Sequence, residues 1–399
     1  MTPERRADVA YLTAIAIGVL FVLLGGPLAR RLELVPINDF SGVWAGSRMF
    51  LLGTSPWDPA SYRDAAASLG TQIPEANVFS YMPWVMFFVL PLALVPLEVA
   101  GWIWMVVGIA AATVALRALL RAFLPGMTAA HGALGLALFV GQPGFHTIVL
   151  GQWSLLLMSA VAATVLLIRA GHAYLAAVPA LLFMAKPQLF VFTAIGLAHG
   201  ALRRPALRRY VLFALFVALA VVLVSWLLVG DWLTPWLADV PGRRTPRSAV
   251  LQSALFELIG PTGRWIAAAL ILFGAFLASR FTPGSDSALA AWLSLSSAGA
   301  IYSWSYDQVL LFVPLVMAAG VLARSSRRAA TRFALIWAGV FVVVSPILYA
   351  IGVARHDETF SCVVPDAAFI AIVALLWRQR HANDPVTEHA ALAVSHAAA

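Results

Sequence analysis

A carboxylate, Asp39, stands shortly after the first apolar block of the chain, directly behind Asn38. It opens the segment 40–52, in which apolar residues recur at roughly helical spacing, so we expect an amphipathic helix lying on the membrane surface. Two interpretations of Asp39 remain open. In the first, Asp39 or the neighbouring Asn38 caps the start of this helix. In the second, the Asp39 carboxylate does acid–base chemistry on a substrate.

A second carboxylate, Asp307, follows Tyr306 at the start of another apolar block. A carboxylate at the edge of hydrocarbon is costly unless it is hydrated, paired or used. Asp307 is therefore a second catalytic candidate, with Tyr306 as a substrate-binding neighbour. The alternative is structural, because the helix dipole stabilises an acid at a helix N-terminus without any further role.

Cations that could bind an anionic group occur in three places. Lys186, the single lysine, stands with a proline inside an apolar block, which indicates a cavity or a buried partner. Arg243, Arg244 and Arg247 lie between two apolar blocks and could clamp a phosphate or merely contact anionic lipid headgroups. Arg48, on the predicted surface helix, could also bind the substrate or simply extend to the membrane surface.

Two uncharged polar residues are further candidates for substrate binding. Gln152 follows a glycine between two apolar blocks, and Tyr81 lies in the aromatic motif of residues 79–84, which an interfacial belt of aromatic side chains would also explain. The histidines, among them His146 and His356, do not have the spacing of metal ligands. The sequence also lacks nucleotide-binding loops and paired-cysteine motifs, so we expect no metal and no cofactor.

The composition around these residues is that of a membrane protein. The chain has 399 residues, of which 62% are hydrophobic and 11% charged, whereas a soluble domain carries about a quarter charged residues. Unbroken apolar blocks such as 211–229 exclude the alternating pattern of a membrane β-barrel. The net charge of +8 comes almost wholly from arginines that punctuate these blocks, which indicates contact with membrane lipids and argues against a nucleic-acid partner.

The apolar blocks predict an all-α polytopic membrane protein with about twelve spanning helices, between about ten and thirteen, at roughly 20 residues for each crossing. An even number places both termini on one side, and the arginine-rich links 203–209, 324–332 and 378–380 fall on that side, as expected for the cytoplasm. The expected spans are 9–29, 80–96, 100–120, 130–146, 150–168, 173–199, 210–229, 265–280, 287–303, 309–323, 333–352 and 363–377.

This topology predicts one transmembrane domain, 1–378, with external loops at 30–80 and 230–264 and a mobile cytoplasmic tail at 379–399. Most acidic residues then lie outside. The weak part is 100–170, where Arg117, Arg121 and Arg169 would face outward and Gln152 inward, unless some of these helices are broken or re-entrant.

Several motifs, in their order along the chain, resemble those of glycosyltransferase family 87. The resemblance covers about 38–315 and extends to mycobacterial mannosyltransferases that use polyprenyl-phosphate mannose and have the GT-C architecture, with external juxtamembrane helices. The motifs are Asp39-Phe40, the turn 53–58, Tyr81 with Pro83, Gly151-Gln152 and Lys186-Pro187.

The resemblance implies an inverting glycosyl transfer at the outer face of the plasma membrane. A polyprenyl-phosphate sugar, mannose in first place, would reach the site laterally, and an external carboxylate would activate a hydroxyl of a lipid or glycan acceptor. The counterpart of the family's essential carboxylate is Asp39. Mannosyl members commonly carry a histidine near the position of Tyr306 and Asp307, so this departure leaves the sugar and the base open.

The chief alternative function is that of a secondary transporter or lipid flippase. Such a protein would usually show internal repeats and acids at the middle of the membrane, and the sequence shows neither. A purely structural membrane protein would not need its acids and the arginine segment 243–247 on one side. The sequence therefore favours the transferase.

Overall fold

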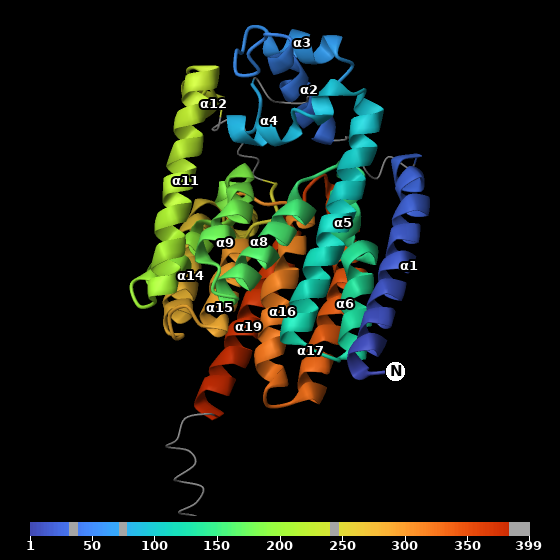
Figure 1. Cartoon of the computed structure of the whole chain (residues 1–399), viewed down its shortest axis with the longest axis vertical. Helices are drawn as coiled ribbons and strands as arrows, with labels where there is room; N and C mark the ends of the chain where they lie inside the picture. The colour runs from blue at the N-terminus through green and yellow to red at the C-terminus, as the bar shows by residue number, and fades with distance from the viewer. Residues whose placement is uncertain (32–38, 72–77, 240–246, 383–399) are drawn as a thin grey trace, which may run out of the picture.

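The computed structural model describes residues 1–31, 39–71, 78–239 and 247–382, and every regular element in these ranges is helical. The helices form an elongated bundle. Helix α1 (Pro3–Arg31) begins at the end of the bundle where α19 (Val363–Ala382) finishes, and we call this the terminal end (Figure 1). The short helices α2 (Asp39–Leu51), α3 (Tyr62–Ser68), α4 (Pro83–Val89) and α12 (Leu233–Asp239) lie at the opposite end, the distal end (Figure 1).

Seven helical segments in the described ranges are long and apolar enough to cross a membrane, or eight if the bent pair α6–α7 is counted as one more span. The all-helical membrane fold is thus confirmed, whereas the expected number of about twelve spans is not. The seven are α1 and six others, namely α5 (Leu97–Phe123), α11 (Pro205–Val229), α14 (Pro261–Ser279), η5–α16 (Ser305–Leu311, Phe312–Ala323), α17–η6–α18 (Arg327–Gly339, Val340–Val344, Ser345–Arg355) and η7–α19 (Thr359–Cys362, Val363–Ala382).

The spans differ sharply in burial, which shows which of them face lipid. In η5–α16, 83% of the span is buried, so this segment is the centre of the bundle. In α11 only 6% is buried although the helix is strongly apolar beyond Arg209, so its surface must face lipid. The shorter helices packed among the spans are α6 (Thr128–Val140), α7 (Gln142–Leu150), α8 (Ser154–Arg169), α13 (Leu251–Ile259) and α15 (Asp286–Ala298).

The apolar stretch 80–96, expected as the second span, does not cross the bundle. It divides into the seven-residue helix α4 and the 3-10 turn η1 (Leu92–Leu94), because Pro91 and Pro96 interrupt the helix. Trp44 of α2 fixes the stretch at the distal end by donating its indole Nε1–H towards the Leu92 and Val95 carbonyls, each at 3.2 Å.

The stretch 173–199, also expected to span, enters the bundle and returns. Its first residues lie beside Arg209 at the start of α11, and its last helix ends at Ala201, shortly before α11 begins. Because both ends lie at the terminal end, the chain must reverse in between, and it does so around Lys186 and Pro187. The pieces are α9 (Ala173–Ala180), η2 (Leu181–Ala185), η3 (Pro187–Leu189) and α10 (Val191–Ala201).

Without these two crossings, the segment 97–172 runs in the opposite direction from the one predicted. This explains the arginines that the predicted topology placed outside. Arg117 and Arg121 of α5 bind Asp8, near the start of α1, with 3.1 Å between Arg117 Nη2 and Asp8 Oδ2. Arg169 lies 2.5 Å from Asp286 at the start of α15. These arginines therefore lie at the terminal end with the other basic links, and not outside as expected.

The bend between α6 and α7 carries the chain to the distal end. The two helices meet at 40° around Gly141. The backbones approach so closely that a Cβ atom on Gly144 would lie 1.6 Å from the Leu138 carbonyl oxygen, so only glycine fits there. Gly151 then ends α7 in the left-handed conformation (φ 71°), and Gln152 follows it.

Candidate active site

Four polar side chains from distant parts of the sequence gather on the distal side of the central span. Asp39 is the first residue of α2, Gln152 links α7 to α8, Lys186 stands at the reversal between η2 and η3, and Asp307 lies in η5. They form two bonded pairs, Asp39 with Gln152 and Lys186 with Asp307. The pairs are neighbours, since Ser154, which begins α8, also binds Asp307.

Gln152 holds the carboxylate of Asp39 through a hydrogen bond from its Nε2 to Asp39 Oδ2. The backbone around Gln152 is itself fixed, because its N–H donates to the Thr147 carbonyl at 2.8 Å and Trp104 Nε1 donates to the Gly151 carbonyl at 3.0 Å. Burial raises the pKa of Asp39, while the hydrogen bond from Gln152 lowers it in part. Asp39 is therefore an oriented carboxylate of increased basicity.

A row of aromatic rings packs beside this pair. Phe40 stacks on Trp104 with 5.1 Å between ring centroids, and Trp104 meets the edge of Trp153 at 4.6 Å. Tyr81 continues the row, 6.1 Å from Trp153. Phe40, Trp104 and Trp153 are buried, so the row adds an apolar wall on the residues that adjoin Asp39 and Gln152.

Lys186 and Asp307 form a buried ion pair. Lys186 Nζ lies 2.8 Å from Asp307 Oδ1, and the two side chains are 8% and 2% exposed. Ser154 Oγ donates to the same Oδ1 at 2.6 Å, and the Trp304 backbone N–H donates to Oδ2 at 3.2 Å. Both oxygens of Asp307 are thus engaged, which a buried ion pair needs if it is to offset the loss of hydration.

Tyr306 and a set of polar side chains that the sequence analysis did not assign lie next to this ion pair. The Tyr306 ring stands 4.6 Å from Lys186 Nζ and makes an edge contact with His146. Gln142 Nε2 lies 3.1 Å from His146 Nδ1 and donates to Ser305 Oγ at 2.8 Å. Isolated polar residues inside apolar blocks were the sequence signal that could have identified this set.

Glu358, just before η7, completes the buried polar layer. Its Oε2 accepts the Ser305 backbone N–H at 2.9 Å, and burial raises the pKa of its carboxyl. The Glu358 N–H donates to the Arg247 carbonyl at 3.2 Å. The backbone at Arg247 is therefore linked to Ser305 through Glu358.

Two buried polar atoms of the consecutive residues Gln152 and Trp153 have no hydrogen-bond partner in the part of the chain that the structure describes. They are Gln152 Oε1, an acceptor, and the indole Nε1–H of Trp153, a donor. Each unpaired buried group costs about 1–3 kcal/mol. A hydroxyl group both donates and accepts, so a ligand rich in hydroxyls could satisfy both atoms.

The remaining predicted site residues have other positions. Arg48, in the last turn of α2, donates from Nη1 to the Ala93 carbonyl at 3.0 Å and so fixes η1, away from Asp39 at the first turn. Over the described ranges, no three His, Cys, Asp or Glu side chains form a group that could hold a metal ion. Asn38, Arg243 and Arg244 lie outside the described residues.

Comparison with known proteins yields one family. The model of glycosyltransferase family 87 matches residues 79–304, more than half of the chain. The matched part includes Gln152 and Lys186 and ends at Trp304, just before Asp307. No curated protein and no solved structure matches the chain.

Proposed function

Since the chain belongs to glycosyltransferase family 87, it is a membrane glycosyltransferase, and we propose that its donor is a polyprenyl-phosphate sugar. The sugar, mannose in first place, passes with inversion to a hydroxyl of a lipid or glycan acceptor. The distal end faces the extracytoplasmic side of the plasma membrane, and both termini face the cytoplasm. The gathering of Arg117, Arg121 and Arg169 at the terminal end supports this orientation.

The observation that carries this proposal is the position of Asp39. A general base must be oriented, must be basic enough, and must lie where the substrate can reach it. Gln152 orients the carboxylate, burial raises its pKa, and α2 holds it at the distal end. The unpaired atoms of Gln152, which binds Asp39, and of its neighbour Trp153 are suited to binding hydroxyl groups.

The transfer then needs a single carboxylate. The acceptor oxygen attacks the anomeric carbon from the face opposite the phosphate, while its proton passes to the carboxylate of Asp39. The bond between the anomeric carbon and the phosphate oxygen breaks, and its electron pair leaves with the phosphate. The configuration at the anomeric carbon is thereby inverted, and the lipid phosphate departs with one more negative charge.

Lys186 is the cation that we assign to this growing negative charge, with Arg243, Arg244 and Arg247 as further donors. Asp307 is then a positioning residue and not the base, because Lys186, Ser154 and the Trp304 N–H already engage both of its oxygens. A transporter or flippase could also contain such an ion pair. Family membership favours the transferase over that alternative.

The test is sugar transfer by purified protein in detergent, with polyprenyl-phosphate mannose as the donor and a lipid extract as the acceptor. Asp39→Asn removes the base but keeps the shape of the side chain, so transfer should fall to background. Asp58→Asn is the matched control. Asp58 lies in the same external segment, but its carboxylate is exposed and, among the described residues, accepts hydrogen bonds from the Ser61 hydroxyl and the Ala60 N–H alone.

We expect Asp58→Asn to retain the turnover of the unmodified protein. Retained turnover in folded Asp39→Asn would show that another group is the base. Transfer from a nucleotide sugar, with none from the polyprenyl-phosphate donor, would contradict the proposed donor class.

A further inference from the structure

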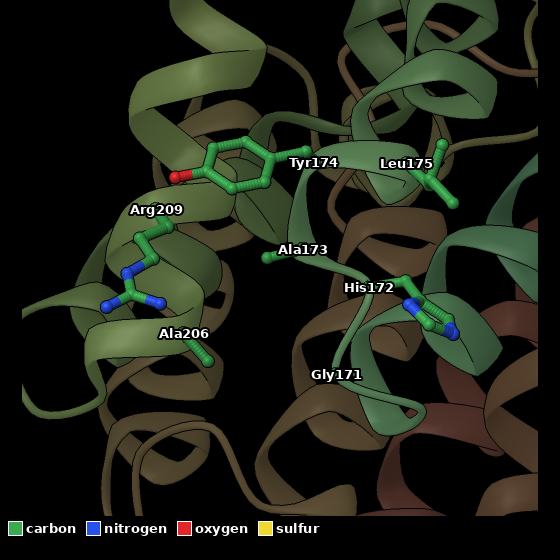
Figure 2. Close-up of a pocket in the computed structure, with 7 residues that line it drawn as sticks. All are labelled: Gly171, His172, Ala173, Tyr174, Leu175, Ala206 and Arg209. Atoms are coloured by element: carbon green, nitrogen blue, oxygen red, sulfur yellow. The ribbon is translucent and has the colours of Figure 1, made fainter.

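A recess of about 200 Å³ lies at the terminal end, far along the bundle from Asp39. Its walls are the tight link between α8 and α9 and the first turns of α11. Figure 2 shows Tyr174 and Arg209 on one side and His172 on the other. Gly171, in the left-handed conformation (φ 81°), turns the chain at the bottom of the recess.

Arg209 brings to this recess a charge that the fold does not neutralise. Its side chain is exposed, and no carboxylate among the described residues forms an ion pair with it. Elsewhere at the terminal end, Asp8 and Asp286 each bind two arginines. The stability of α11 does not account for a cation at this position either, because the helix dipole disfavours a positive charge in the first turns.

The position of Arg209 along α11 gives the depth of the recess in the membrane. Helix α11 is the span with the least buried surface, so lipid surrounds it over most of its length. It begins at Pro205, and the basic residues Arg203, Arg204 and Arg208 flank Arg209. The recess therefore lies at the level of the headgroups, where the phosphates of one leaflet are found.

An aromatic surface continues from the recess towards the middle of the membrane. Tyr174, 56% exposed, meets the edge of Phe213 with 5.3 Å between ring centroids. Phe213 stacks with Phe216 one turn further along α11, at 6.3 Å, and Phe216 is 66% exposed. A cationic recess joined to an exposed apolar row has the two chemistries of a phospholipid, a phosphate headgroup and an acyl chain.

We propose that the recess of Gly171–Leu175, Ala206 and Arg209 is a binding site for an anionic glycerophospholipid of the leaflet at the terminal end. The lipid phosphate pairs with Arg209, the Tyr174 hydroxyl and His172 border the glycerol headgroup, and an acyl chain lies along Phe213 and Phe216. This lipid is distinct from the sugar donor, whose proposed site is at the distal end.

The experiment measures which lipids remain bound to the full chain after extraction from vesicles of equal parts phosphatidylglycerol and phosphatidylcholine. Native mass spectrometry gives the ratio of the two lipids on the protein. The unmodified chain should retain phosphatidylglycerol in preference. Arg209→Ala should lower this ratio about fivefold, the effect expected for one basic side chain at an anionic surface, and Arg209→Lys should keep most of it.

Arg328→Ala is the matched control, because Arg328 is also exposed near the terminal end but does not line the recess. It should leave the ratio unchanged. If Arg328→Ala lowers the ratio as much as Arg209→Ala, the preference is a general charge effect and the site is refuted. Equal retention of both lipids by the unmodified chain also refutes it.

Two further measurements keep the test decisive. Inorganic phosphate, added at increasing concentration, should not displace the lipid; displacement would identify a small-anion site and overturn the lipid assignment. Helical content and elution volume identify a variant that has failed to fold, and Arg209→Gln replaces Arg209→Ala in that event. Sugar transfer in detergent serves as a separate readout, which Arg209→Ala should not change.

Discussion

Lys186 and Asp307 form an ion pair at the distal part of the central span, with 2.8 Å between Nζ and Oδ1. From the sequence, each was an isolated charge with its own candidate role, a phosphate-binding cation and a second base. Their pairing changes both of these assignments. Asp307 holds the lysine in place, and Asp39 remains as the carboxylate with one oxygen that no hydrogen bond from the described residues engages.

The ion pair predicts different outcomes for stability and for transfer. Lys186→Met or Asp307→Asn alone leaves one buried charge unpaired and should lower stability by about 3–5 kcal/mol. The double variant leaves no buried charge at this place, so its thermal midpoint in detergent should return most of the way to that of the unmodified protein. Transfer should still fall about a hundredfold in kcat/KM for the donor, because the cation that we assign to the departing phosphate is absent. A double variant with normal stability and normal donor use would contradict the role of Lys186.

The Asp39–Gln152 hydrogen bond predicts the acid side of the pH profile. A general base works only when deprotonated, so kcat/KM should decrease as the pH falls through the pKa of Asp39, which burial places above its ordinary 3.8. Gln152→Leu removes a donor that stabilises the charged form. The pKa should therefore rise further, and the acid limb should move to higher pH.

Gln252→Leu is the control for that shift, because Gln252 donates to the Ile301 carbonyl and does not contact Asp39. It should leave the pH profile in place. A Gln152→Leu profile that keeps its acid limb, with only a lower maximum, would mean that Gln152 does not act through the pKa of Asp39.

The helical fold and several site candidates were predictable, because long apolar blocks and isolated charges are local signals. The helix expected near Asp39 is confirmed as α2, whereas its position on the membrane surface stays a prediction. The span expected at 80–96 was wrong because hydropathy does not register two prolines, Pro91 and Pro96, that end a helix. The reversal at Lys186 was missed for the same reason, because hydropathy does not register Pro187 and the apolar stretch 173–199 is long enough to cross a membrane.

The pairings within the site could not be predicted. Gln152 and Asp39 are 113 positions apart, and Lys186 and Asp307 are 121 apart. Such contacts depend on how the spans pack. The expected inward position of Gln152 followed from counting 80–96 as a span, because one extra crossing inverts the chain behind it as far as the second extra crossing, 173–199.

This inversion makes an accessibility prediction. His172 should lie on the same side of the membrane as Ser325, whereas the twelve-span topology places it with Ser68. All three residues are exposed, and the single native cysteine, Cys362, is buried and can be replaced by alanine. An impermeant thiol reagent applied to intact cells should label Ser68→Cys but not His172→Cys or Ser325→Cys. Labelling of His172→Cys together with Ser68→Cys would restore the twelve-span topology.

The bend at Gly144 predicts a link between packing and the site. In Gly144→Ala the added methyl group would meet the Leu138 carbonyl oxygen, which is backbone and cannot move aside cheaply. We expect a loss of about 1–3 kcal/mol or more, seen as a lower thermal midpoint, and weaker transfer, because α7 no longer presents Gln152 to Asp39 at the correct angle. Gly101→Ala in α5 is the control, since no atom lies within 4 Å of its added methyl, and helix propensity predicts a gain of up to about 1 kcal/mol. If both variants behave alike, the close approach of α6 and α7 does not determine the geometry of the site.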